Sequence, residues 1–284
     1  WLSVSVFTTL SVAFGVGVPT ALGNECTKLD QDSPILSNGF GQDQSNTRNG
    51  ISSITSKNVS HLRLRYALGG SDSKKPGKLA KERRGAPAVT EQALFYFVGA
   101  QIVAAGRRTG CEFWTTTLTN PEDGKPDTPR SSSLLLVDNP SGGRMLFVGS
   151  TSGFVYGLDA ANGSTLWSKS VSEDPKDRDP MHMVTGGMQY YNGRLFVPVA
   201  TFEVLFAKNP DYPCCSSRGR VVAFNAFDGA FLWAFDSVPA GGSGGSVWSA
   251  LSVDPARNQL LIAVGQNFTQ PATAFSDAIV AIDL

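Results

Sequence analysis

Apolar and polar residues alternate in short runs along this chain, and turn-forming residues separate the runs. The clearest runs are QALFYFVGA (92–100), RMLFVGST (144–151) and GRLFVPVA (193–200). Alternation with a period of two, bounded by Gly, Pro or Asn, predicts β-strands with one face in a core. No long segment shows the 3.6-residue period of an amphipathic helix, so the pattern predicts an all-β protein.

Three segments form an internal repeat: QIVAAGRRTGCEFW (101–114), GFVYGLDAANGSTLW (153–167) and GRVVAFNAFDGAFLW (219–233). In each segment an apolar strand leads to a turn with a glycine, and a tryptophan follows that glycine by four residues. The pairs are Gly110 with Trp114, Gly163 with Trp167, and Gly229 with Trp233. Each unit is predicted to be a β-hairpin, because glycine supplies the positive φ of the turn and the returning strand carries the tryptophan to the core face.

Repeats of roughly fifty residues, each with about four short strands, predict the blades of a β-propeller, since one small sheet cannot bury both faces alone. We expect the repeated tryptophans to be core residues that pack between blades. The last run, SDAIVAIDL (276–284), stops before a glycine turn and a tryptophan. About four blades are therefore expected, as the N-terminal part of a longer propeller. If this were the whole chain, a second copy would be a natural way to complete the ring.

Charge argues against some partners. The chain has 24 Lys and Arg and 24 Asp and Glu, so it carries no net charge that would hold nucleic acid or an anionic membrane. The chain is apolar from Trp1 to about Val18 and then offers small residues at Ala21 and Gly23. This pattern predicts the remnant of a signal peptide at 1–23, ahead of a propeller domain at 24–284. A buried strand or helix, or a membrane anchor, is the alternative, but the run is short for a membrane span. A signal would place the protein in the periplasm or outside the cell.

Several catalytic motifs are missing from the sequence. His61 and His182 are too few and too separate for a histidine-rich metal site. Gly-x-Gly-x-x-Gly does not occur, which argues against nicotinamide cofactors. Cys-x-x-Cys-His is also missing, so this stretch holds no covalently attached haem.

Two of the four cysteines, Cys214 and Cys215, are neighbours in YPCCSSRG (212–219). Adjacent cysteines can close an eight-membered disulfide ring, which distorts the peptide between them and is kept where a site uses it. Two free buried thiols, or one bond each to Cys26 and Cys111, are the alternatives. Cys26 and Cys111 could also bond to each other.

Four motifs in order resemble the quinoprotein alcohol dehydrogenases that bind pyrroloquinoline quinone (PQQ), and among them the polyvinyl alcohol dehydrogenases. The motifs are NGFGQDQSNTR (38–48), TGGMQYYNGRLFVPVATFE (185–203), NPDYPCCSSRGRVVAFNA (209–226) and the segment from GGSVWS (244–249) to the C-terminus. The resemblance implies an eight-bladed propeller that binds PQQ and usually calcium. It implies oxidation of secondary alcohols or a hydroxylated polymer, with an electron acceptor such as a cytochrome c.

The resemblance also implies how the quinone would be stacked. It places a ring formed by Cys214 and Cys215 on one face of the quinone and Trp248 on the other. In the methanol-oxidising relatives the cysteine pair sits in an earlier blade, whereas here it follows Glu203. The glycines before Trp248 let backbone approach a flat ligand closely, although they would also suit a surface loop.

Polar roles follow from the same resemblance. Thr185 would hydrogen-bond the quinone, and Glu203, eighteen residues later, would be a calcium ligand, since a hard cation binds anionic oxygen. Glu203 could instead pair with Arg218 or Arg220. Arg218 could bind a quinone carboxylate through a bidentate pair, or be a solvated surface residue.

A second calcium ligand is expected eighteen residues after Trp248, where the family carries Asn. Gln266 holds that position here and Asn267 comes one residue late. The catalytic Asp that takes the alcohol proton is expected beyond Leu284, and Asp277 is expected to start a strand. A cofactor-free propeller that serves as a binding scaffold is the competing interpretation, and it explains only the repeats.

Overall fold

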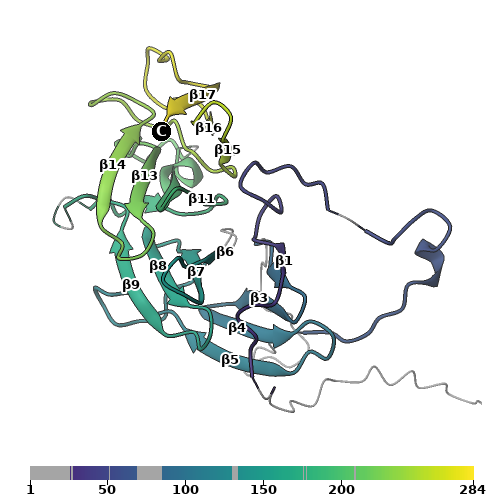
Figure 1. Ribbon diagram of the computed structural model, residues 1–284. Helices are drawn as coiled ribbons and strands as arrows, with labels where there is room; N and C mark the ends of the chain where they lie inside the picture. The colour runs from purple at the N-terminus through teal and green to yellow at the C-terminus, as the bar shows by residue number, and fades with distance from the viewer. Residues whose placement is uncertain are drawn as a thin grey trace, which may run out of the picture.

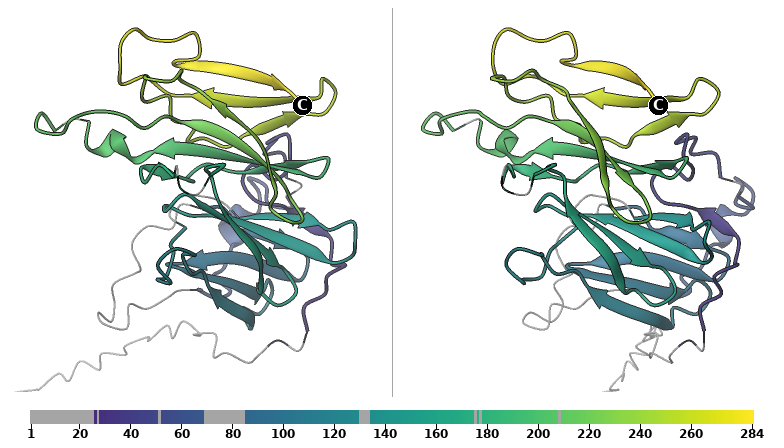
Figure 2. Two further views of the ribbon diagram at one scale, coloured as in Figure 1. Left: turned by 90° about the vertical axis from the view of Figure 1, so that its left-hand side faces the viewer. Right: turned by 60° about the vertical axis from the view of Figure 1, so that its left-hand side comes forward.

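Four antiparallel β-sheets follow one another around an open arc in the computed structural model of this chain (Figure 1). The structure describes residues 26, 28–50, 52–68, 85–129, 134–174, 176, 178–207 and 209–284. The predicted signal segment 1–23 lies outside them. Side views show the sheets stacked face to face (Figure 2), as blades of a propeller are.

The first two blades have regular up-and-down strand order. Blade one contains β1 (Ile35–Ser37), β2 (Ala88–Thr90), β3 (Ala93–Val98), β4 (Gln101–Gly106) and β5 (Glu112–Thr117). Blade two contains β6 (Leu135–Asp138), β7 (Arg144–Gly149), β8 (Phe154–Asp159) and β9 (Thr165–Ser170). The runs predicted at 92–100 and 144–151 are therefore strands, as expected.

The last two blades carry the loops that matter for the site. Blade three contains β10 (His182–Met183), β11 (Gln189–Tyr191), β12 (Arg194–Thr201), β13 (Arg220–Asn225) and β14 (Phe231–Asp236). Blade four contains β15 (Ser252–Asp254), β16 (Gln259–Val264) and β17 (Ala278–Asp283).

The described helices are short 3-10 turns, including η1 (Val59–His61) and η3 (Phe202–Leu205). None of the described helices is long and apolar enough to cross a membrane. The all-β prediction and the count of four blades are confirmed.

The three predicted hairpins are β4–β5, β8–β9 and β13–β14. Their turn glycines have φ between 70° and 75°, a region that favours glycine. Each tryptophan lies opposite a small residue of the preceding strand, and the register shifts directly after that pair in all three blades. The repeat seen in the sequence is thus a repeat of backbone geometry.

The repeated tryptophans join neighbouring blades. Trp114 Nε1 donates to the carbonyl oxygen of Ala160 at 3.1 Å, and Trp167 Nε1 donates to that of Ala226, also at 3.1 Å. The apolar clusters of the core lie between adjacent blades in the same way. The predicted packing of these two tryptophans between blades is confirmed.

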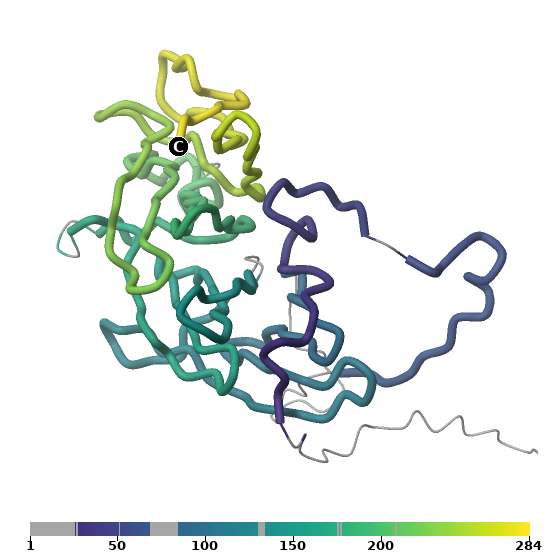
Figure 3. The backbone as a smooth tube through the Cα atoms, in the orientation of Figure 1, coloured from purple at the N-terminus to yellow at the C-terminus, as the bar shows by residue number. Residues whose placement is uncertain are grey.

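An N-terminal segment, residues 38–50, leaves the first blade and reaches the edge of the last one (Figure 3). The amide of Leu136 in blade two donates to the Asn38 carbonyl at 2.7 Å. The amide of Val253 in blade four donates to the Gln44 carbonyl at 2.9 Å. This crossing segment therefore connects blades that are distant in the sequence, and it closes one side of the site described next.

Candidate functional site

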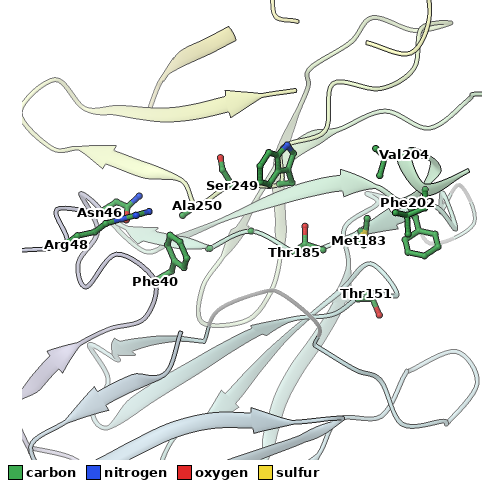
Figure 4. A pocket seen from close by; sticks show the side chains of 14 residues that line it. Phe40, Asn46, Arg48, Thr151, Met183, Thr185, Phe202, Val204, Ser249 and Ala250 are labelled. Carbon is green, nitrogen blue, oxygen red and sulfur yellow. The ribbon is translucent and has the colours of Figure 1, made fainter. Parts of the chain in front are cut away.

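Two backbone segments approach each other closely at the mouth of blades three and four. Residues 183–187 leave β10, and residues 248–250 precede β15; the amide of Leu251 donates to the Gly187 carbonyl at 3.1 Å. A Cβ atom on Gly186 would lie 2.2 Å from the carbonyl oxygen of Ser249, so only glycine fits there. Figure 4 shows, close up, side chains of both segments around the cavity that they border, among them Thr185 and Ser249.

This cavity has a volume of about 820 Å³. A smaller cavity of about 170 Å³ adjoins it, and the two share Met183, Thr185, Val204 and Trp248. Trp248 is 65% exposed, although large aromatic side chains in a folded protein are mostly buried. An open indole face beside a hydroxyl group is a surface on which a planar aromatic ligand can stack. The structure thus brings together Thr185 and Trp248, two of the predicted cofactor residues.

The glycines before Trp248 serve the protein backbone itself. Gly244 has φ +92°, and a Cβ atom there would lie 2.6 Å from the Phe268 amide nitrogen and 2.7 Å from the Gln266 carbonyl oxygen. Gly244 forms bridges with both Asn267 and Arg218. These glycines therefore hold the segment before Trp248 against neighbouring backbone.

Gln266 and Asn267 have different surroundings. Gln266 lines the smaller cavity together with Trp248. Asn267 accepts a hydrogen bond from the Ser276 hydroxyl, and its buried amide nitrogen has no hydrogen-bond partner among the described residues. Of the two candidate amide ligands, Gln266 is the one beside the cavity.

Glu203 is a member of η3, and only 2% of it is exposed. Its neighbours Phe202, Val204 and Leu205 line the larger cavity. The carboxylate accepts hydrogen bonds from the Tyr212 hydroxyl and from the segment that follows the cysteine pair. Burial and the bond to Glu203 raise the pKa of the Tyr212 phenol, so Tyr212 is a donor at neutral pH.

A calcium site was predicted from Glu203 with Gln266 or Asn267. In the part of the chain that the structure describes, no group of three or more His, Cys, Asp or Glu side chains is arranged to hold a metal ion. The Glu203 carboxylate is occupied by hydrogen-bond donors, and the cavity beside Gln266 is lined by neutral side chains. A calcium ion, which needs six to eight oxygen ligands, does not fit this donor set.

All four cysteines form disulfides, Cys26 with Cys111 and Cys214 with Cys215. The adjacent pair therefore forms the predicted ring, and the alternatives of free thiols and of bonds from this pair to Cys26 and Cys111 are wrong. The residues that line the two cavities beside Trp248 do not include Cys214 or Cys215. The ring lies in the segment whose two flanks contact the Glu203 carboxylate.

Arg218 does not line the cavities beside Trp248. It borders a separate polar cavity of about 730 Å³, which is also lined by Asp179, His182 and Ser216. Its guanidinium pairs with Asp236 at 3.1 Å and donates to the Val238 carbonyl at 3.1 Å. Arg218 is therefore not at the cavity that Thr185 and Trp248 line, and its ion pair, like that of Arg220, is with Asp236 and not with Glu203.

The crossing segment supplies site residues that sequence reasoning missed. Phe40, Asn46 and Arg48 line the large cavity (Figure 4), and Arg48 is the one charged residue among the described residues that line it. The Arg48 guanidinium carbon lies 5.0 Å from the centre of the Phe40 ring. Asn46 and Arg48 both have positive φ, at 56° and 54°. The motif NGFGQDQSNTR was visible in the sequence, but nothing in it indicated that the segment reaches across to blade four.

Repeated antiparallel sheets around an open arc, with tryptophans docked between them and a cavity at their mouth, define the β-propeller class. Residues 38–284 match the family described as PQQ: "Glucose/ethanol/alcohol dehydrogenase, beta-propeller domain". The chain therefore belongs to this family of quinoproteins.

Two curated relatives are polyvinylalcohol dehydrogenases. The one from a Pseudomonas species is 28% identical over 276 residues, which cover 90% of this chain and 40% of the relative. The one from Sphingopyxis sp. (strain 113P3) is 29% identical over 197 residues, which cover 64% of this chain and 29% of the relative. The chain thus spans well under half the length of these relatives.

Solved structures agree on the fold. The quinohemoprotein alcohol dehydrogenase ADHIIG from Pseudomonas putida HK5 superposes with a TM-score of 0.65 at 20% identity, over 89% of this chain and 39% of that one. The quinohemoprotein alcohol dehydrogenase from Comamonas testosteroni gives a TM-score of 0.61 at 20% identity, over 88% of this chain and 39% of that one. The predicted quinoprotein propeller is confirmed.

Proposed function

We propose that the protein to which this chain belongs is an exported, PQQ-dependent alcohol dehydrogenase, and that the cavity beside Trp248 is its quinone site. The observation that carries the proposal is the composition of this cavity: an open indole, a threonine hydroxyl and a single charge, the cation of Arg48. PQQ is planar and carries carboxylates, so stacking on an aromatic ring and pairing with a guanidinium suit it. Membership of the PQQ family supports the same assignment.

When bound, PQQ supplies the oxidant, which accepts a hydride from the alcohol carbon while the hydroxyl proton leaves to a base. In this chain Trp248 would support the ring system and Thr185 would donate to a quinone oxygen. Arg48 would neutralise a carboxylate, a role that was not expected from the sequence. No carboxylate or imidazole occurs among the described residues that line the cavity, so none of them is assigned as the base.

The substrate is proposed to be a secondary alcohol or a hydroxylated polymer of the polyvinyl alcohol kind. The two relatives that are polyvinylalcohol dehydrogenases support this class. We propose a periplasmic or secreted location, which two disulfides in one chain support because such bonds persist in oxidising compartments. A cytochrome c is proposed as the electron acceptor.

The test is a titration of the protein expressed from its complete gene with PQQ, with and without added calcium, followed by dye-linked oxidation of a secondary alcohol and of polyvinyl alcohol. We expect saturable PQQ binding, weakened in Trp248→Leu, and activity on at least one of the two substrates. Failure to bind at micromolar PQQ with excess calcium would leave the propeller as a cofactor-free scaffold.

A further inference from the structure

The carboxylate of Glu203 contacts both sides of the cysteine pair. On the N-terminal side, the Tyr212 hydroxyl donates to Oε1 at 2.9 Å. On the C-terminal side, the Ser216 amide donates to Oε1 and Oε2 at 3.0 Å each, and the Ser217 amide donates to Oε2 at 2.7 Å. One buried side chain thus holds the residue two positions before Cys214 and the two residues directly after Cys215.

Aromatic contacts reinforce this arrangement. The Tyr212 ring lies 5.3 Å from the Phe206 ring, which lies 5.5 Å from the Phe202 ring, measured between centres. Phe202 lines the large cavity. The amides of Phe206 and Ala207 donate to the backbone carbonyl of Glu203 at 2.9 and 2.8 Å. The segment therefore folds back onto η3, whose other residues form the cavity wall.

These hydrogen bonds use the acceptor capacity of the carboxylate. A carboxylate offers about four lone-pair positions, and a calcium ion would need the same oxygens at about 2.3–2.6 Å. Both oxygens already accept backbone amides, which are fixed donors that cannot turn away. Hydrogen bonds to an ionised acceptor are about twice as strong as neutral ones, so releasing them for a cation is unfavourable.

We propose that Glu203 is the positioning residue for the Cys214–Cys215 ring and is not a metal ligand. The carboxylate fixes the two flanks of the ring, and η3 transmits that position to the cavity wall through Phe202, Val204 and Leu205. The anchoring stands without any cofactor; only its consequence for the quinone, a fixed wall beside Trp248, rests on the proposed function.

Glu203→Gln tests the anchoring, because glutamine keeps the length and one acceptor oxygen but replaces the other with a donor. We expect amide hydrogen exchange at Ser216 and Ser217 to accelerate by at least about fivefold in the protein without PQQ. The matched control is Glu173→Gln, since Glu173 is an exposed acid that borders the same polar cavity as Ser216. The control should exchange like the unmodified protein at Ser216 and Ser217.

A calorimetric titration with calcium alone tests the second half of the proposal. We expect the substitution Glu203→Gln to leave calcium binding unchanged: if the unmodified protein binds calcium, the variant should bind it equally well, and if the unmodified protein does not, neither should the variant. Unchanged exchange at Ser216 and Ser217, or calcium binding lost in Glu203→Gln only, would overturn the proposal.

Tyr212→Phe is the alternative variant if Glu203→Gln does not fold. It removes the hydroxyl donor to Glu203 and keeps an aromatic ring against Phe206. Amide exchange of 214–217 should then rise a few-fold, and no rise would count against the anchoring.

Neither measurement uses PQQ, so failure of the proposed function would not imitate failure of this inference. A protein that never binds PQQ can still show the anchoring. A protein that binds PQQ can still fail the exchange test.

Discussion

Trp167 of blade two donates its indole N–H to the carbonyl of Ala226 in blade three, at 3.1 Å. The same ring lies under the turn glycine of that blade, where a Cβ atom on Gly229 would come within 2.8 Å of it. The tryptophan thus binds a carbonyl oxygen of the next hairpin and also fills the space left by the missing side chain of its turn glycine. Because Trp114 and Ala160 repeat the relationship one blade earlier, each interface between these blades is fixed by the hairpin that follows it.

Trp167→Leu should therefore destabilise the propeller strongly. The change removes the hydrogen bond and leaves a cavity beside Phe147 and Phe224, the two rings that Trp167 contacts. We expect the free energy of unfolding in urea to fall by about 3 kcal/mol. Trp248→Leu is the matched control, because Trp248 is largely exposed and should change stability by no more than about 0.5 kcal/mol. Equal losses in the two variants would contradict the assignment of roles.

The fold could be predicted because its determinants are local and repeated. The four-residue spacing from turn glycine to tryptophan sets a hairpin register, and that register recurs three times. Even the packing of the tryptophans between blades follows from their fixed place in the repeat. The spacing of Gly163 and Trp167 in the sequence therefore already indicated their places in the structure, the glycine in the hairpin turn and the tryptophan between blades.

The site was predicted only in part, because spacing does not show how a side chain points. Thr185, Trp248 and Gln266 lie at one cavity as the resemblance implied. Spacing placed Glu203 at a strand end, but Glu203 lies in η3, where its carboxylate accepts the Ser216 and Ser217 amides, and it does not line the cavity. Arg48 comes from a segment whose path across the blades has no signal in the hydrophobic pattern.

Gly186→Ala should separate the two backbone segments at the cavity mouth. The added methyl group would lie 2.2 Å from the Ser249 carbonyl oxygen, a backbone atom that cannot move alone. We expect a loss of about 1–3 kcal/mol in the free energy of unfolding, together with weaker PQQ binding. In the control Gly187→Ala, the methyl group would meet side-chain carbons of Phe40 and Ala250 at 3.0 Å, so the effect should be smaller. A larger loss in Gly187→Ala would show that the close approach at Gly186 is not the limiting one.

His182 should make stability depend on pH. Burial lowers its pKa, with Asp179 opposing, and its ring faces Arg220, Asp236 and the Arg218 carbonyl, 2.9 Å from Nε2. The unfolded chain therefore binds the proton more readily than the folded one. The stabilisation is fully present above about pH 6.5, the ordinary histidine value, and decreases as the pH falls below it.

In His182→Gln the glutamine amide can still donate to the Arg218 carbonyl but does not titrate. The free energy of unfolding, measured in urea at several pH values between about 7.5 and about 5, should fall less steeply with decreasing pH in this variant than in the unmodified protein. His61→Gln is the control, since His61 is exposed at the end of η1. If the free energy of unfolding of His182→Gln depends on pH as that of the unmodified protein does, other groups cause the acid sensitivity.

Arg48→Gln should weaken PQQ binding without unfolding the protein. The guanidinium is exposed and is the single charge among the described residues that line the cavity, so its loss removes the electrostatic preference for a carboxylate. A hydrogen bond to a charged group contributes about 1.5–3 kcal/mol, which corresponds to a rise in Kd of about 10- to 150-fold. Arg48→Lys keeps the charge but not the planar fork, so its Kd should be intermediate.

Arg63→Gln is the control, because the Arg63 side chain donates to the nearby Ser60 and Leu62 carbonyls and does not line the cavity. If Arg48→Gln and Arg63→Gln have the same Kd as the unmodified protein, the carboxylates of PQQ are held elsewhere, and the cation of the crossing segment has no part in binding.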